Sequence, residues 1–409
     1  MPASSFLRRP LVGLGTLTIA LTALCSAHAN GTRIPNQGAH ATARGNAFVA
    51  TADNPSAIYY NPAGITQLEG TQVLTESYLL LARYDYESPG GNRVKAKREL
   101  AVIPQFYLTH TPRDSRFSYG LGIYAPFGQS SDWPDDSGFR TLATRNEITY
   151  ITAAPTVAWQ ATDSLSLAAS LQINYAKATL RQGLTPSAFL PPGFTDEFRF
   201  EGDDVSFGYN LGVFWQINEQ HVIGLSYQSR ATSDFSGTAD TTYTAPESAR
   251  VSLPYPDIIT LGWSWRPTPR WNFEFAIDRT NWELLNSTSV EGTTLGLPPI
   301  VFNWKPSYYY LFGVTRRLDD GWFVSAGYCY SGNSVHNSTY TPAVPDMTRH
   351  LGRIGIGRDL GRFTGYLTYQ HGFKGSRTVT GAPGTTFESP DGRYTSSLDA
   401  INLSLNYAF

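Results

Sequence analysis

SLSLAASLQINYA, residues 164–176, is a run in which apolar and polar side chains alternate at almost every position. Side chains of a β-strand point to opposite faces in turn, so one face of this strand is apolar and the other polar. The closing stretch INLSLNYAF, residues 401–409, repeats the pattern and ends on an aromatic residue. Both stretches predict an all-β fold, although strands of water-soluble sandwiches alternate as well.

The composition favours a membrane environment. Charged residues make up 16% of the chain, against about 25% in a typical soluble protein, and aromatic residues reach 13%. Yet no run comes near the roughly 20 apolar residues of a membrane helix. Only helices and closed barrels satisfy every backbone polar group inside lipid. The composition therefore predicts a β-barrel in a bacterial outer membrane.

Residues 1–29 have the three-part build of a secretory signal peptide: Arg8 and Arg9, an apolar run over 11–24, and a site of mostly small residues at 27–29. Their removal takes two of the 31 Lys and Arg and none of the 33 Asp and Glu, which leaves a formal charge of −4. Nucleic acid is therefore not an implied partner. Cys329 becomes the single cysteine, which excludes an internal disulfide.

Residues 71–409 divide into segments with strand periodicity, and we expect fourteen antiparallel strands, with 12 or 16 as alternatives. Short turns, such as 161–163 and 218–219, alternate strictly with longer connections. This layout is typical of outer-membrane barrels, in which an even number of strands leaves both termini in the periplasm. The expected strands lie near 71–87, 97–110, 116–127, 147–160, 164–180, 203–217, 220–234, 250–266, 270–286, 304–318, 321–332, 348–360, 362–374 and 393–409.

Residues 30–70 do not fit the wall. They contain eight prolines and glycines, which would remove ladder hydrogen bonds and side-chain packing from a membrane strand. Their apolar segments, 47–49 and 58–60, are nevertheless too apolar for a solvated tail. A fourteen-stranded barrel is wider than the roughly 8 strands whose lumen side chains alone can fill. We therefore expect residues 30–70 to form an N-terminal plug, or hatch, inside the lumen.

At this point the sequence resembles the long-chain fatty acid transporter (FadL) family of outer-membrane proteins, which includes aromatic-hydrocarbon uptake relatives. The matching blocks occur in order along the whole mature chain. They are GNAFVA at 45–50, ADNP at 52–55, YNPAG at 60–64, YAPFG at 124–128, LP at 253–254, Trp282 and PDMTRH at 345–350.

The resemblance implies a monomer that takes up fatty acids or other hydrophobic small molecules without an energy source and has outer-membrane lipid as its surroundings. Asn61, Pro62 and Ala63 correspond to the hatch motif of the family, which lies near an inward kink in the third strand. There a side opening lets the ligand leave into the membrane. Gly120 and Gly122 are our candidates for the kink, because glycine inside a strand marks a bend or a close approach. Alternatively, they accommodate a neighbouring aromatic side chain.

The loop at 186–194 is unusually apolar for an exposed segment, and such patches usually mark interaction sites. We expect the loop that holds Trp133 and Phe139 to face it. These two loops supply the ligand-binding candidates Trp133, Phe139, Phe189, Leu190 and Phe194. The alternative is that these loops fold on each other over the mouth.

A carboxylate head group would also need a cation. The best candidate is Arg349, which lies in the matching 345–350 block, with Arg181 and Lys177 as weaker ones. Each could instead form a salt bridge at the rim or in the lumen.

Other functional classes find less support. An outer-membrane lipase needs a base beside its nucleophile, and the nearest arrangement, 336–338, lies in a loop. No metal-ligand spacing is present. We therefore expect no enzyme activity, no metal and no cofactor. A general diffusion porin remains an alternative, and nothing in the sequence separates fatty acids from aromatic hydrocarbons as the ligand.

Overall fold

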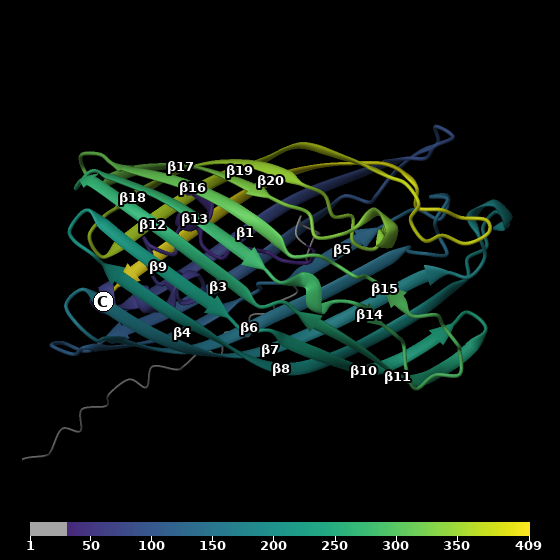
Figure 1. The fold of residues 1–409 in the computed structure, drawn as a ribbon, viewed down its shortest axis with the longest axis horizontal. Helices are drawn as coiled ribbons and strands as arrows, with labels where there is room; N and C mark the ends of the chain where they lie inside the picture. Colours follow the sequence, from purple (N-terminus) through teal and green to yellow (C-terminus); the bar gives the residue numbers. More distant parts are fainter. Residues whose placement is uncertain (1–30) are drawn as a thin grey trace, which may run out of the picture.

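The computed structural model describes residues 31–409 and shows a closed antiparallel β-barrel (Figure 1). Closure comes from β1 (Gly70–Glu87), which pairs with β20 (Gly392–Ala408) over sixteen residue pairs. The wall has fourteen strands, as expected, and four of them consist of two segments each: β2/β3, β4/β5, β9/β10 and β11/β12. The other strands of the wall are β6 (Arg145–Gln160), β7 (Leu165–Gly183), β8 (Glu197–Gln216), β13 (Trp271–Thr280), β16 (Ser307–Arg317), β17 (Trp322–Ser331), β18 (Arg349–Asp359) and β19 (Phe363–Val379).

The segmented strands break at defined points. β2 (Arg93–Lys95) and β3 (Glu99–Thr111) both pair with β1, and β4 (Phe117–Tyr124) and β5 (Gly128–Asp132) both pair with β6. β9 (His221–Gln228) and β10 (Ala231–Thr241) both pair with β8. β12 (Ile258–Thr268) pairs with β9, and β11 (Thr244–Tyr255) pairs with β10.

The wall is apolar on its outside, the reverse of a soluble protein. Along β7, Leu171 is 49% exposed and points outward, whereas the next residue, Gln172, is 2% exposed and points into the lumen. This alternation is what a strand between lipid and a polar interior requires. The sequence pattern at 164–176 therefore reflects the two faces of the barrel wall.

The two ends of the barrel differ. Tight turns and the C-terminus lie at one end, here called the turn end, and the long connections gather at the other, the loop end (Figure 1). Several strands reach further toward the loop end than expected: β8 begins at Glu197 rather than near 203, and β19 continues to Val379. Conversely, the strand expected over 270–286 ends at Thr280, and the chain from 281 to 306 leaves the wall.

The N-terminal segment lies inside the barrel near the turn end, and most of its side chains are fully buried. It forms the short helices α1 (Ala39–Ala43), α2 (Ala57–Tyr60) and η1 (Pro62–Gln67). Buried ion pairs connect it to the wall, with Arg33 Nη1 2.7 Å from a carboxylate oxygen of Asp278. No helix within residues 31–409 is long and apolar enough to cross a membrane.

Candidate functional site

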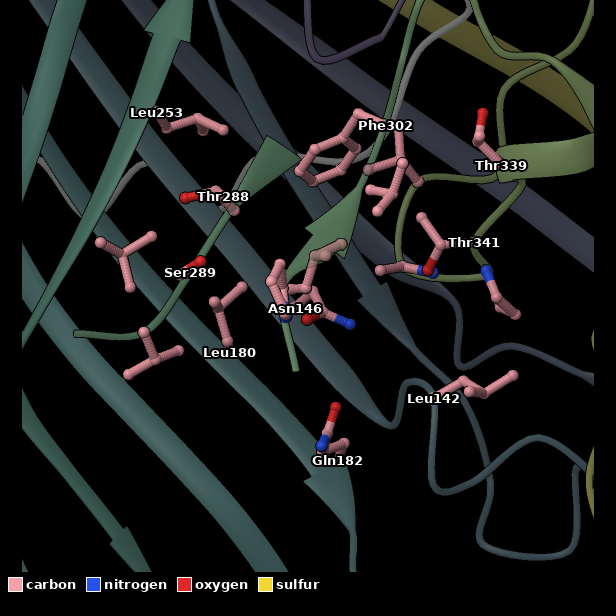
Figure 2. A pocket seen from close by; sticks show the side chains of 18 of the residues that line it. Leu142, Asn146, Leu180, Gln182, Leu253, Thr288, Ser289, Phe302, Thr339 and Thr341 are labelled. Atoms are coloured by element: carbon pink, nitrogen blue, oxygen red, sulfur yellow. The ribbon is translucent and has the colours of Figure 1, made fainter. Parts of the chain in front are cut away.

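A cavity of about 470 Å³ lies in the lumen at the loop end, between the barrel wall and the long connections (Figure 2). Inward side chains of β6, β7, β8, β10 and β11 form one side, and three connections, around 288–304, 339–344 and 383–385, form the other. The lining is mainly apolar and includes Leu142, Ile148, Ala178, Leu180, Phe198, Phe235, Val251, Leu253, Trp282, Leu285, Phe302 and Trp304.

The connection between β13 and β16 forms the floor of this cavity. Its two ends bind each other, since Trp304 N donates to Leu285 O (3.2 Å), and the rings of Trp282 and Trp304 pack edge to face with centroids 4.9 Å apart. Gly31 lies directly against both tryptophans, and a Cβ atom there would come within 2.7 Å of each ring. The floor of the cavity is therefore in contact with the start of the hatch.

Two carboxylates hold the loops above the cavity. Arg140 donates to Asp196 (2.7 Å), and Glu388 accepts hydrogen bonds from Thr141 and Ser187, which belong to two different loops. Burial alone would raise the pKa of Asp196, but hydrogen bonds from Thr185 and Arg140 outweigh it and lower this pKa to about 2.

Burial opposes the ionised form of Glu388 as well. Hydrogen bonds from Ser187 and Thr141 again outweigh it, and they hold the pKa of Glu388 below its ordinary value. Both carboxylates are therefore charged at neutral pH.

Trp133 and Phe139 lie beside the cavity and do not line it. Both are buried in an aromatic cluster in which the Phe139 ring is 5.3 Å from Trp133 and 5.0 Å from Tyr86. Trp133 Nε1 also donates to the carbonyl oxygen of Pro342 (3.0 Å), a residue that does line the cavity. The two side chains thus support the cavity from behind.

Phe189, Leu190 and Phe194 lie on the connection between β7 and β8, and none of them lines the cavity. Phe189 is 58% exposed and packs edge to face against Phe387, 5.0 Å away. Their role as a landing surface stays a prediction.

Arg349 lies inside the lumen, is 2% exposed, and donates through Nη2 to the hydroxyl of Tyr84 (2.9 Å). Its Nε and Nη1 find no hydrogen-bond partner among the described residues. Arg353, two inward positions further along β18, is also buried and donates to Gln370 (2.7 Å), which in turn accepts from Asn36 of the hatch. Among the described residues, neither guanidinium lies within 4 Å of a carboxylate. The lumen therefore holds two arginines, Arg349 and Arg353, that have no carboxylate within 4 Å among the described residues.

Arg181 and Lys177, the weaker candidates, both form ion pairs. Arg181 lines the cavity and lies 3.4 Å from Glu197. Lys177 points outward from β7 and lies 2.5 Å from Glu201.

The hydrogen-bond ladder of the wall is interrupted beside the hatch. Three residues, 125–127, separate β4 from β5, whereas only 150 and 151 separate their partners on β6. The register between β3 and β4 ends at Phe106 and Ile123, and the next backbone bond across is Lys97 N to Asp132 O (2.8 Å). Within the described chain, no strand pairs with residues 99–105 on this side.

At this opening the backbone of the third strand binds the hatch. Ile34 N donates to Pro126 O (2.8 Å) and Gly128 N donates to Thr32 O (2.8 Å). The side-chain amide of Gln37 donates to Ala125 O (2.6 Å) and accepts from Ala125 N (3.3 Å). The hatch thus supplies hydrogen-bond partners to the backbone of residues 125–128, where the third strand does not pair with β3.

The bend of the third strand does not lie at Gly120 or Gly122, and the part of these two residues in a lateral opening stays a prediction. Gly120 and Gly122 lie in an unbroken stretch of β4 that pairs with β6 throughout. A Cβ atom at Gly120 would lie 2.7 Å from Cδ1 of Ile58, and one at Gly122 would lie 3.0 Å from its Cγ2. These glycines therefore allow the close approach of the hatch, and the bend follows them at 125–127, where Pro126 lacks the N–H that a ladder needs.

The hatch motif contacts another part of the wall. Asn61 Oδ1 accepts from Ala63 N (3.2 Å) and so caps the helix that begins at Pro62. Asn61 Nδ2 donates to Val49 O (2.7 Å) and to Val213 O of β8 (2.9 Å). The motif thus binds β8, and the segment that meets the bend is 32–37.

Sequence reasoning missed most of the cavity lining. The run LPPIVF at 297–302 is as apolar as the loop at 186–194, and this signal could have identified the cavity floor. No such signal marks the segment 339–344. Within residues 31–409, no three His, Cys, Asp or Glu side chains are grouped to hold a metal ion.

Comparisons with known proteins agree with this architecture. The long-chain fatty acid transport protein of Escherichia coli is 21% identical over 410 residues, which cover 88% of this chain and 90% of that protein. A putative outer membrane protein of Neisseria meningitidis is 24% identical and matches 99% of both chains.

Solved structures share the fold. A FadL homologue of Pseudomonas aeruginosa superposes with a TM-score of 0.80 at 20% identity and covers 93% of this chain and all of its own. The toluene transporter of Ralstonia pickettii gives a TM-score of 0.69 at 17% identity, covering 93% of this chain and 99% of its own. The family model described as outer membrane protein transport protein (OMPP1/FadL/TodX) matches residues 20–364. The chain therefore belongs to this family of bacterial outer-membrane transport proteins.

Proposed function

We propose that the protein takes up hydrophobic compounds passively, as a monomer and without catalysis. The ligand binds in the loop-end cavity, passes the arginines above the hatch, and leaves sideways between β3 and β5 into the membrane. The observation that carries this proposal is the unpaired edge of β3 at residues 99–105. Backbone N–H and C=O groups without hydrogen-bond partners are costly in lipid, so such an edge in the wall indicates a function. The names of the relatives, transporters of fatty acids and of toluene, support the same class of cargo.

The orientation is part of the proposal. We place the loop end outside the cell and the turn end, with both termini, in the periplasm, since outer-membrane barrels have short periplasmic turns and longer external loops. A ligand then enters an apolar cavity from the outside, and each methylene removed from water contributes about 0.8 kcal/mol to binding.

The arginines favour a long-chain fatty acid as the ligand. A buried charge without a partner is costly, and Arg349 and Arg353 have no carboxylate within 4 Å in the described chain. A carboxylate head group would supply charge-assisted hydrogen bonds. A neutral aromatic hydrocarbon, the alternative cargo, would leave both charges as they are. The buried hatch argues against a general porin, which needs an open lumen.

The wall opening can be tested by removing one residue. Deletion of Pro126 leaves two residues opposite 150 and 151, so that β4 can continue into β5 in register with β6 and without the inward bend. We expect uptake of a labelled long-chain fatty acid to fall to background while the protein keeps the heat-dependent gel mobility of a folded barrel. Pro126→Ala keeps the residue count and should transport normally. A folded deletion variant with normal uptake would exclude lateral exit at this site.

A further inference from the structure

The outer face of the barrel carries an apolar groove of about 590 Å³ near the turn end, across β16 to β19. It exists because the outward side chains of β17 are short at Val324 and Ala326, while the flanking strands carry larger ones. Trp271 and Val314 form one flank, and Ile354, Ile356, Leu367 and Tyr369 form the other.

Two arginines flank the turn-end part of this groove. The Arg316 guanidinium lies 5.1 Å above the ring of Trp271, and that of Arg358 lies 4.9 Å above the ring of Trp322. In the sheet register, Arg316 is opposite Val324 and Arg358 is opposite Trp322, so the two arginines lie on either side of β17.

Neither arginine has a carboxylate within 4 Å among the described residues. Nearby arginines at the same end do: Arg270 lies 2.9 Å from Asp319, and Arg317 lies 3.8 Å from Asp53. Arg316 and Arg358 point outward, where an arginine keeps its stem on apolar surface and its charge at the edge of the lipid. The arrangement thus combines a slot for an acyl chain with two unpaired cations at its polar end.

We propose that this groove binds one anionic phospholipid of the membrane leaflet at the turn end. One acyl chain lies along Val324 and Ala326, and the phosphate accepts hydrogen bonds from Arg316 and Arg358. The stacking on the two tryptophans holds both guanidiniums in place, and guanidinium–phosphate hydrogen bonds are stronger than neutral ones. The site lies outside the lumen and does not depend on the proposed transport route.

Native mass spectrometry of the detergent-purified protein tests this. Phosphatidylglycerol should remain bound at about tenfold lower lipid concentration than zwitterionic phosphatidylethanolamine. Arg316→Gln with Arg358→Gln should remove this preference, whereas Arg270→Gln, which changes a paired arginine at the same end, should retain it. Ala326→Phe fills the groove and should weaken binding of both lipids.

Three results would overturn the proposal. They are equal retention of the two lipids by the natural protein, unchanged phosphatidylglycerol binding by the double arginine variant, and unchanged binding by Ala326→Phe. Lipid A, the phosphate-bearing lipid of the other leaflet, serves as a competitor, and its displacement of phosphatidylglycerol at lower concentration would contradict the leaflet assignment. Heat-dependent gel mobility confirms that each variant is folded.

Discussion

Gln37 is the hatch side chain that holds the third strand in its inward bend, and we expect Gln37→Leu to slow uptake strongly. Its amide binds both the carbonyl oxygen and the N–H of Ala125 and also donates to Ile34 O (2.8 Å). Leucine has a similar size, so it fills the buried site but leaves both backbone groups of Ala125 without their partner.

The size of the effect follows from these two groups. A buried polar group that loses its hydrogen bond costs about 1–3 kcal/mol, so the inward bend of Ala125 becomes less stable by about 2–6 kcal/mol. The competing straight strand regains bonds by pairing β5 with the free edge of β3. Even about 2 kcal/mol changes the ratio of bent to straight strand by about 30-fold. We therefore expect uptake to fall at least about tenfold.

The assay is uptake of a labelled long-chain fatty acid by cells that carry this protein as their transporter, with hydrogen exchange at residues 125–132 as a structural measurement. Gln67→Leu is the matched control. The side-chain amide of Gln67, like that of Gln37, donates to backbone carbonyl oxygens, but the three that it binds all lie within the hatch. If folded Gln37→Leu protein shows normal uptake and normal exchange, the hatch does not hold the bend.

Three further results are expected. Gly120→Val should slow uptake without unfolding the barrel, because its side chain displaces Ile58, and Ile58→Ala in the same chain should restore transport; failure of this rescue would contradict the contact. Arg349→Gln should lower uptake of a fatty acid about tenfold but leave a neutral aromatic compound unaffected, and equal effects on both would exclude a head-group role. Because the folded pKa of Glu388 is depressed, its hydrogen bonds stabilise the loops above its ordinary value of 4.5 and are lost as the pH falls through the lower folded value. Proteolysis of the loop at 184–196 should therefore increase as the pH falls below that ordinary value, and Glu388→Gln should already show this at pH 7.

The barrel wall could be predicted because its signal is local. The alternation of apolar and polar residues indicates the two faces of each strand, and the strict order of short and long connections indicates the two ends of the barrel. The structure confirmed the closed fourteen-stranded barrel that these signals predict. The strand ends could not be predicted in the same way. Beyond the apolar band, as at the start of β8, the alternation is inverted: Glu197, Arg199 and Glu201 lie on the outer face, and Phe198 and Phe200 point inward. The backbone ladder continues there, because it needs no apolar side chain.

The cavity and the bend depend on contacts between distant parts of the chain. Asn146, Leu253, Phe302 and Thr341 line one cavity, yet nothing in their local sequence connects them. At the bend, the two meanings of glycine in a strand were confused: Gly120 marks a close approach, not a change of direction. Pro126 removes a ladder donor at the bend itself, but proline alone does not identify it, since Pro104 lies in an unbroken stretch of β3.

The opening and the hatch are one structural unit. Inside a membrane every backbone N–H and C=O needs a partner, so a strand can leave the wall only where another segment takes over its bonds. Residues 32–37 do this for the bend, but no strand does it for β3 over 99–105 on the side that faces β5. That edge must be satisfied by water or by a passing polar group. On the proposed lateral route, an edge that needs polar partners would suit a ligand with a carboxylate head better than a pure hydrocarbon, in agreement with the proposal drawn from the arginines in the lumen.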